Sequence, residues 1–219
     1  MRRLILKDKF YLNFDAPCVL ITENDLVDSI KSFHPGEWCT VEYRKDEFLA
    51  FVNPNTKRKE KVTVFNTKKI DPLSLIFENI DKAISYRASI GYGLNSRIIY
   101  GNEDGLPGLI LDGYVDCAVL QINTAGLDKY RNEIKEYLLE KLQKDVIFLD
   151  NSKYRSIEEL PFFENDKLPD YINVLESDFK YSIDKKNMQK VGYYYDHREN
   201  RKKFENVIKS SISKAKTGL

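Results

Sequence analysis

Histidine and cysteine are scarce in this sequence of 219 residues, which has two histidines and three cysteines. Cys18, Cys39 and Cys117 stand far apart and form no Cys-x-x-Cys pair, which argues against a disulfide framework and against a zinc site. We therefore expect three buried free thiols and no bound metal. A hydrolase that uses Asp196 and His197 as a metal or acid-base centre stays open as an alternative, although no second histidine stands at ligand spacing.

Long apolar runs are absent as well. No stretch approaches the roughly eighteen consecutive apolar residues of a membrane span, and the first residues lack the apolar core of a signal peptide. We therefore expect a cytoplasmic protein with no membrane partner. With 42% hydrophobic and 12% aromatic residues, the chain has enough apolar surface to bury a core and is not a disordered segment.

The net charge of +1 conceals an uneven distribution along the chain. Residues 1–70 contain 13 Lys and Arg against 10 Asp and Glu, and residues 180–219 contain 11 against 4. The middle, residues 71–179, contains 11 against 20 and is acidic. Because phosphate binding needs clustered positive charge, we expect any nucleic-acid contact at the two ends and not in the middle.

Residues 1–68 alternate short apolar runs with turn residues such as Asn53-Pro54. The strand-like runs lie at residues 18–21, 38–43, 48–52 and 61–65. Several short strands in so short a segment favour a small β-barrel. Its basic residues are candidates for binding phosphates, with an ordinary solvated surface as the alternative interpretation. They are Arg2, Arg3, Arg44, Lys45, Lys57, Arg58 and Lys59.

The middle of the chain alternates helical and strand patterns, after a linker at residues 68–72. Apolar spacing predicts helices at 73–90 and 127–144, and apolar runs predict strands at 98–100, 109–114, 117–123 and 146–149 and a hairpin at 171–175 and 179–183. Three glycines and a proline in residues 101–108 predict tight turns. We expect the neighbouring Glu103 and Asp104 to cap backbone N–H groups or to pair with Arg87 or Arg97.

Near the C-terminus, residues 192–201 combine three tyrosines with Asp196, His197 and two arginines, a mixture that suits the edge of a polar ligand pocket. Residues 202–216 then predict an amphipathic helix with an apolar face. That face contains Phe204, Val207, Ile208, Ile212 and Ala215. In an alternating fold a strand would follow such a helix, so we expect the chain to stop in mid-architecture.

Two motifs resemble one family. Residues 189–201, Gln-Lys-Val-Gly-Tyr-Tyr-Tyr-Asp-His-Arg-Glu-Asn-Arg, and residues 101–109, Gly-Asn-Glu-Asp-Gly-Leu-Pro-Gly-Leu, are similar to motifs of the SAM-dependent 23S ribosomal RNA (cytosine-C5) methyltransferases. Val191 replaces the usual Thr and His197 the usual Gln. The segment 155–160 resembles a family Arg-x-x-Glu-Gly-Leu run in which Glu159 replaces the glycine, and we expect a changed turn there.

The resemblance implies an α+β fold with three parts. Residues 1–68 would form a PUA-like RNA-binding β-barrel and residues 72–188 a central α/β domain. Residues 189–219 would begin a truncated Rossmann-like methyltransferase domain and end in its first helix. Methylation of a cytosine base further implies a single-stranded or extruded target.

The resemblance also implies ligands and roles. Tyr194, Asp196, Arg198 and Arg201 would border the pocket for S-adenosylmethionine and substrate, and ribosomal RNA would be the partner. No residue of the chain is assigned as catalytic. We therefore expect the 219 residues alone neither to bind the cofactor nor to transfer methyl groups. A stand-alone, non-catalytic RNA-binding module is the alternative, and a homodimer stays open.

Overall fold

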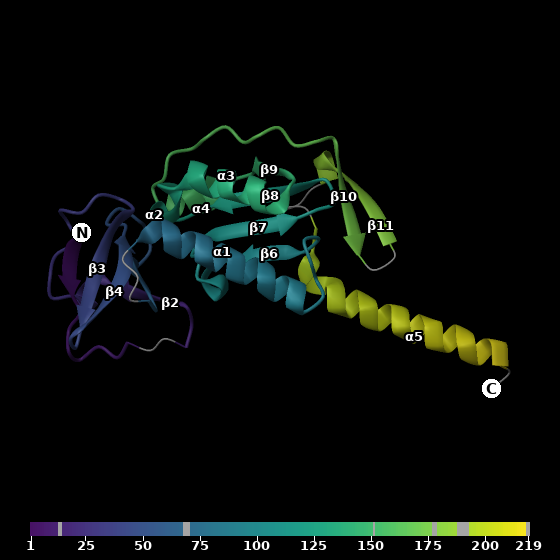
Figure 1. Cartoon of the computed structure of the whole chain (residues 1–219), viewed down its shortest axis with the longest axis horizontal. Helices are drawn as coiled ribbons and strands as arrows, with labels where there is room; N and C mark the ends of the chain where they lie inside the picture. The colour runs from purple at the N-terminus through teal and green to yellow at the C-terminus, as the bar shows by residue number, and fades with distance from the viewer. Residues whose placement is uncertain (13–14, 68–70, 151, 177–178, 188–192, 218–219) are drawn as a thin grey trace.

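The computed structural model describes the chain except residues 13–14, 68–70, 151, 177–178, 188–192 and 218–219 (Figure 1). The predicted α+β class is confirmed. An N-terminal sheet, a central sheet with helices and a hairpin follow one another, and a last helix projects from them (Figure 1). In the part of the chain that the structure describes, no helix is both long and apolar enough to span a bilayer.

The N-terminal sheet has five strands in the order β1-β3-β4-β5-β2, with β1 parallel to β3 and the other pairs antiparallel. Its strands are β1 (Arg2–Ile5), β2 (Cys18–Thr22), β3 (Glu37–Tyr43), β4 (Asp46–Val52) and β5 (Glu60–Phe65), with a short 3-10 helix, η1 (Glu23–Asp25). The predicted strands are all present. Between the outermost strands β1 and β2 the described residues form no ladder, so strand pairing does not close this sheet into the expected barrel.

The central sheet has four strands in the order β6-β7-β8-β9, of which only β8 and β9 are parallel. Its strands are β6 (Arg97–Tyr100), β7 (Leu109–Gly113), β8 (Cys117–Ile122) and β9 (Asp145–Phe148). The helices around it are α1 (Pro72–Ser89), η2 (Gly101–Asp104), α2 (Ala125–Asp128), α3 (Arg131–Leu142) and α4 (Ser152–Ile157). The single helix predicted at 127–144 is therefore two helices, and α4 was not predicted.

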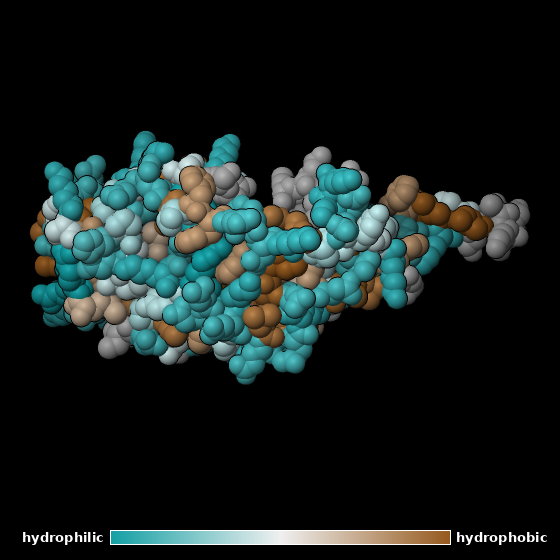
Figure 2. Space-filling model, turned by 90° about the horizontal axis from the view of Figure 1, so that it is seen from above, coloured by the Kyte–Doolittle hydropathy of each residue, from teal (hydrophilic) through white to brown (hydrophobic). Residues whose placement is uncertain are grey.

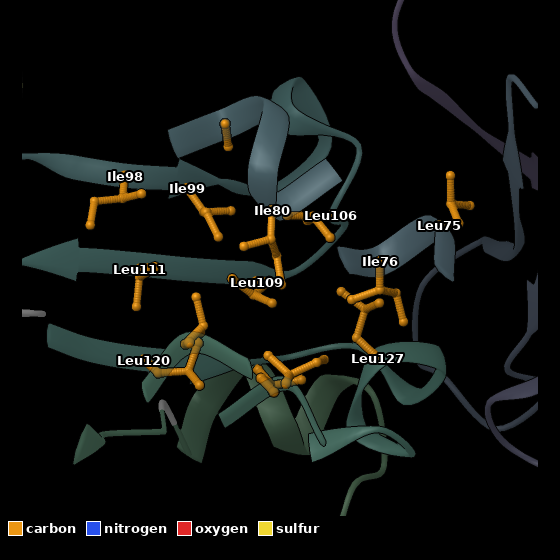
Figure 3. Close-up of a cluster of buried hydrophobic side chains, with 14 of the residues drawn as sticks. Leu75, Ile76, Ile80, Ile98, Ile99, Leu106, Leu109, Leu111, Leu120 and Leu127 are labelled. Atoms are coloured by element: carbon orange, nitrogen blue, oxygen red, sulfur yellow. The ribbon is translucent and has the colours of Figure 1, made fainter. Parts of the chain in front are cut away.

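Helix α1 begins where its sequence provides a cap and a proline. The Asp71 carboxylate accepts a hydrogen bond from the Ser74 backbone N–H at 2.8 Å, and Pro72 occupies the first turn. The buried face contains Leu75, Ile76 and Ile80, which pack against the strands and Leu127 (Figure 3). Because α1 and α3 pack on the same face of the central sheet, this apolar layer anchors both helices.

The two sheets share one apolar core. Trp38, Phe51 and Phe65 of the N-terminal sheet belong to the same buried cluster as the residues of α1 and α2. Trp38 also donates its indole N–H to the Gly126 carbonyl at 3.0 Å. We call this contact, between residues 36–65 and residues 125–127, the junction. Because aromatic rings bury large areas, the junction joins the two sheets into one packed unit.

The opposite face of the central sheet is covered by C-terminal elements. The strands β10 (Tyr171–Glu176) and β11 (Phe179–Asp184) form the predicted antiparallel hairpin. Ile172 and Val174 of β10 pack with Val119 and Ile147 of the sheet, and Tyr195 completes this cluster. Tyr195 lies in the 3-10 helix η4 (Tyr195–His197), which follows the hairpin and η3 (Lys185–Asn187).

The final helix α5 (Arg198–Thr217) extends away from the rest of the molecule (Figure 1). It contains the predicted helix, but the apolar face is not covered. Phe204, Val207, Ile208 and Ile212 are 67%, 60%, 41% and 51% exposed. Hydrophobic residues lie along this projecting segment in the space-filling view as well (Figure 2). Folded domains usually cover an apolar face of this kind.

The three cysteines are free and buried, as predicted. Burial raises the pKa of the thiols of Cys18 and Cys39 to about 12 and that of Cys117 to about 11. Thiols with such pKa values stay protonated at neutral pH, so these cysteines act as small apolar side chains and not as nucleophiles.

Candidate functional site

The seven basic residues singled out in the N-terminal segment do not form one patch. Arg44 and Lys45 lie in the β3–β4 turn, next to the pair Tyr43 and Asp46. The group 57–59 precedes β5, at the end of the sheet where Val52 pairs with Val62. These two groups therefore lie at opposite ends of β4. Arg2 and Arg3 lie between them on the edge strand β1.

Four of the seven have carboxylate partners. Arg2 lies 3.5 Å from Glu37 and over the Phe33 ring at 3.6 Å, and Arg3 lies 2.8 Å from Glu42. Lys57 pairs with Glu159 at 2.7 Å and Arg58 with Glu158 at 3.2 Å.

The other three are Arg44, Lys45 and Lys59. Within the described ranges they form no ion pair, although Arg44 lies over the Tyr43 ring at 4.9 Å. These three are therefore the least neutralised cations of the set.

Glu158 connects two distant segments of the chain, which the sequence motif around it did not predict. Its buried carboxylate accepts hydrogen bonds from Asn53 Nδ2 at 2.9 Å and from Thr56 Oγ1 at 3.1 Å. It thus fixes the β4–β5 loop to the end of α4. The next residue, Glu159, has φ 52. The turn therefore keeps the left-handed backbone that a glycine favours, contrary to the expected change of turn.

Arg155, from the same motif, is fully buried. Its guanidinium donates to both Asp128 carboxylate oxygens, at 2.8 and 3.1 Å, and to the carbonyls of Ile122 and Pro161. The Arg155 and Glu158 motif therefore serves to assemble α4, the central sheet and the N-terminal loop.

In the turn motif 101–108, Asp104 has the partners that the sequence predicted. Asp104 accepts two hydrogen bonds from Arg87, at 2.6 and 2.7 Å, and one from the Tyr100 N–H, which confirms one expected pairing. Arg97 pairs instead with Asp112, at 2.8 and 2.9 Å. The outer edge of the motif faces a cleft between the two sheets.

The predicted cofactor-binding residues lie at the start of α5, and residues 189–192 of their motif fall outside the described residues. Arg201 makes a bidentate pair with Glu176 of β10, at 2.6 and 2.7 Å. Arg198 lies 3.5 Å from the same carboxylate and donates to the Asn95 carbonyl at 2.5 Å. Tyr194 and Asp196 are exposed.

The electrostatics of this cluster are those of an anchoring site. The hydrogen bonds from Arg201 lower the pKa of Glu176, so the carboxylate stays ionised and balances the arginines. Burial raises the pKa of Tyr193 to about 12, and Arg201 lies over that ring at 4.6 Å. Tyr195, which the sequence did not single out, donates its hydroxyl to the Gly113 carbonyl at 2.6 Å.

These contacts do not fit a bound S-adenosylmethionine. The cofactor presents a carboxylate, an ammonium and an adenine, whereas Arg198 and Arg201 already share Glu176. In this structure the two arginines hold α5 on the hairpin. Across the described residues, no group of three or more His, Cys, Asp or Glu side chains is placed to hold a metal ion.

Two solved structures that are titled putative methyltransferases share the fold of this chain. A "putative sam-dependent methyltransferase" from Streptococcus mutans matches 92% of this chain and 53% of its own, with a TM-score of 0.62 and 13% identity. The crystal structure of "a putative methyltransferase complexed with SAH" matches 92% of this chain and 52% of its own, with a TM-score of 0.64 and 13% identity. At this identity the likeness shows the fold.

The curated proteins to which this chain is similar are named as large-subunit ribosomal RNA methyltransferases. The "Putative ribosomal RNA large subunit methyltransferase" of Methanocaldococcus jannaschii is 31% identical over 189 residues, 83% of this chain and 47% of that protein. "Ribosomal RNA large subunit methyltransferase I" of Cronobacter sakazakii is 27% identical over 81% of this chain and 43% of its own length. No family model matches the chain.

The homologues of this chain are therefore large-subunit ribosomal RNA methyltransferases, which confirms the family resemblance at that level. The chain spans about half the length of the curated relatives it matches.

Proposed function

We propose that this chain provides RNA binding and substrate positioning for a SAM-dependent methyltransferase of large-subunit ribosomal RNA, and that its 219 residues alone do not transfer a methyl group. The observation that supports this most directly is the similarity over 83% of the chain to a relative of which it spans 47%. S-adenosylmethionine would be the cofactor of the whole protein. The target would be a cytosine C5 in an unpaired or extruded base, and the protein would work in the cytoplasm.

Within this proposal the N-terminal sheet is a PUA-like module spanning residues 1–68. Five short strands with cationic turns suit the small RNA-binding domains in which phosphate contacts fix the orientation of the RNA. Arg44, Lys45 and Lys59 are its candidate phosphate ligands, because carboxylates of the described chain do not neutralise them. Residues 72–188 would be the central domain that places the RNA.

The proposed dependence on a catalytic domain is supported by α5. Its apolar residues are exposed, and Arg198 and Arg201 serve to anchor it to Glu176. We propose that α5, within residues 189–219, is the first helix of the methyltransferase domain. The sheet of that domain would bury Phe204, Val207, Ile208 and Ile212 and would bring Tyr194 and Asp196 to the cofactor.

The proposal is tested by titrating the chain with a labelled fragment of large-subunit ribosomal RNA at several salt concentrations. Removing two phosphate contacts with Arg44→Ala and Lys45→Ala lowers the slope of log K against log salt by about 1.4 to 1.8. Lys59→Ala lowers it by about half as much. The matched control is Lys82→Ala with Lys180→Ala, which removes equal charge outside the N-terminal sheet.

Lys57 and Arg58 are unsuitable for this titration. Their partners Glu159 and Glu158 directly follow α4, so replacing Lys57 or Arg58 would also disturb the contact between the β4–β5 loop and α4. Salt-independent binding, or a slope equal to wild type in both N-terminal variants, contradicts the assignment of RNA binding to this sheet. Transfer of labelled methyl groups from S-adenosylmethionine to RNA by the chain alone contradicts the proposed dependence on a further domain.

A further inference from the structure

A cleft of about 350 Å³ opens where the N-terminal sheet meets the outer edge of the turn motif 101–108. We call it the Tyr100 cleft. Its lining comes from the β4–β5 loop, the central sheet with its turn motif, and α4, and includes Arg58, Tyr100, Asn102, Gly108, Asn123 and Tyr154. Its volume falls within the range of about 300 to 1,000 Å³ typical of small-ligand sites. The contacts described above for residues 101–108 are those of Asp104 with Arg87 and with the Tyr100 N–H, and they do not involve the side of the motif that lines this cleft.

Two tyrosines on the lining expose their rings. Tyr100 is 53% exposed at the end of β6, and Tyr154 is 44% exposed on α4. The Arg97 guanidinium lies 5.5 Å from the centre of the Tyr100 ring. Exposed rings held by a rigid sheet offer stacking surfaces for flat ligands, and nucleobases are the flat ligands that such rings commonly bind.

An amide on the lining has an unused acceptor. Asn123 is only 4% exposed, and among the described residues its Oδ1 has no hydrogen-bond partner. Its backbone N–H donates to the Gly108 carbonyl at 3.0 Å, which fixes the residue against the turn motif. A buried amide oxygen without a partner is unfavourable unless a ligand donor satisfies it after a small rotation of the side chain. The exocyclic amino group of a base is such a donor.

The charges at the cleft favour a nucleotide over an apolar peptide. Arg58 contributes a guanidinium that is partly exposed, with its Nε 3.2 Å from Glu158. Lys57 and Lys59 flank it on the same loop, and Glu103 is the acidic residue on the lining. Cations next to exposed rings are the combination with which proteins bind single-stranded nucleic acid.

We propose that the Tyr100 cleft binds one unstacked nucleobase of single-stranded RNA. Tyr100 and Tyr154 stack on the base, Asn123 accepts a hydrogen bond from its edge, and Arg58 contacts the adjoining phosphate. The inference rests on the proposed function and deepens it, because it assigns a base-reading site to an RNA-binding chain. It also explains why the site draws on three parts of the chain, since Arg58 comes from the β4–β5 loop, Tyr100 from the central sheet and Tyr154 from α4.

The test compares a labelled single strand of about ten ribonucleotides with the same strand in a duplex, each titrated with the full chain. The expected result is tighter binding of the single strand. Tyr100→Ala and Tyr154→Ala each weaken it about tenfold with the salt slope unchanged, whereas Tyr100→Phe retains binding. The matched control is Tyr171→Ala, which removes another exposed tyrosine, on β10, and should have no effect on binding.

Homopolymers of the four bases add a readout that structural damage does not mimic. Asn123→Ala should reduce the preference among them while the affinity for the least preferred base stays constant.

The outcomes separate the two proposals. Salt-dependent RNA binding that is equal in wild type, Tyr100→Ala and Tyr154→Ala overturns the cleft and leaves the proposed function standing. No RNA binding by the wild-type chain overturns both.

Discussion

The junction and helix α5 present the same type of apolar surface, and only one of them is covered. At the junction, Trp38, Phe51 and Phe65 pack in one core with α1 and α2. On α5 the apolar face is exposed from Phe204 to Ile212 and only the first turn is anchored. The apolar residues of the junction are therefore covered by other parts of this chain. Those of α5 are not covered by any described residue.

The largest expected effect comes from filling the junction. A Cβ on Gly36 would lie 2.2 Å from the Ala125 carbonyl oxygen, and its φ of +71 is unfavourable for any other residue. Gly36→Ala should lower the free energy of unfolding by about 3 kcal/mol, the sum of overpacking and left-handed strain. Urea denaturation measures it.

The matched control for Gly36 is Gly91→Ala. Gly91 has φ +78, and no atom lies within 4 Å of the position that a Cβ would take, so this substitution should cost only about 1 kcal/mol. Equal losses in the two variants would mean that the junction is loosely packed in solution.

A smaller effect should follow from neutralising the buried carboxylate beside the junction. Glu158→Gln weakens the contacts with Arg58 and Thr56 and should lower the free energy of unfolding by about 1 to 2 kcal/mol. In Glu159→Gln the lost partner is the exposed Lys57, so the change should stay within about 0.5 kcal/mol. The same denaturation measurement decides, and an equal cost for both would contradict the burial of Glu158.

The anchor of α5 should depend on pH. Arg201 lowers the pKa of Glu176 below its ordinary 4.5, so the pair contributes its stability above that pH. The contribution is lost as the pH falls through the lowered pKa, because the protonated acid no longer attracts the arginines. Protection factors of the second-turn amides of α5, which are corrected for the intrinsic pH dependence of exchange, should therefore fall as the pH drops below 4.5 and through the lowered pKa of Glu176. In Glu176→Gln the protection of these amides should be low at every pH, and a pH step in protection that persists in this variant would point to another group.

The smallest effect is expected on the exposed face itself. Phe204→Ser with Ile208→Ser should change the free energy of unfolding by less than about 0.5 kcal/mol, since neither side chain is buried. The control, Ile80→Ser in α1, should cost several kcal/mol. Sizing by light scattering adds a direct test of the homodimer: a mass that halves in the α5 variant would show that a second copy covers this face.

The sequence predicted those structural features that depend on residues close to one another in the chain. Four of the five strands of the N-terminal sheet, the hairpin at β10 and β11 and the pairing of Asp104 with Arg87 depend on patterns within short segments, such as alternation and turn residues. The division between α2 and α3 was missed, because the apolar spacing continues across residues 129–130 although the helix does not.

The candidate site was harder to predict, because its contacts connect distant segments. Glu158 binds Asn53 and Thr56, about a hundred positions away, and no local pattern indicates such a partner. Of the three consecutive tyrosines, Tyr195 is buried, whereas Tyr194, which the sequence analysis singled out, is exposed. The sequence shows three consecutive tyrosines, and nothing in it indicates which of the three side chains points into the core.

The most direct test of where RNA binds is peptide-level hydrogen exchange of the full chain with and without the ribosomal RNA fragment. The account predicts new protection in residues 43–46 and 53–61 of the N-terminal sheet and in residues 97–110 at the Tyr100 cleft, and none in residues 202–212 of α5. Protection confined to the hairpin and α5, with residues 53–61 unchanged, would contradict the assignment of RNA binding to the two packed sheets.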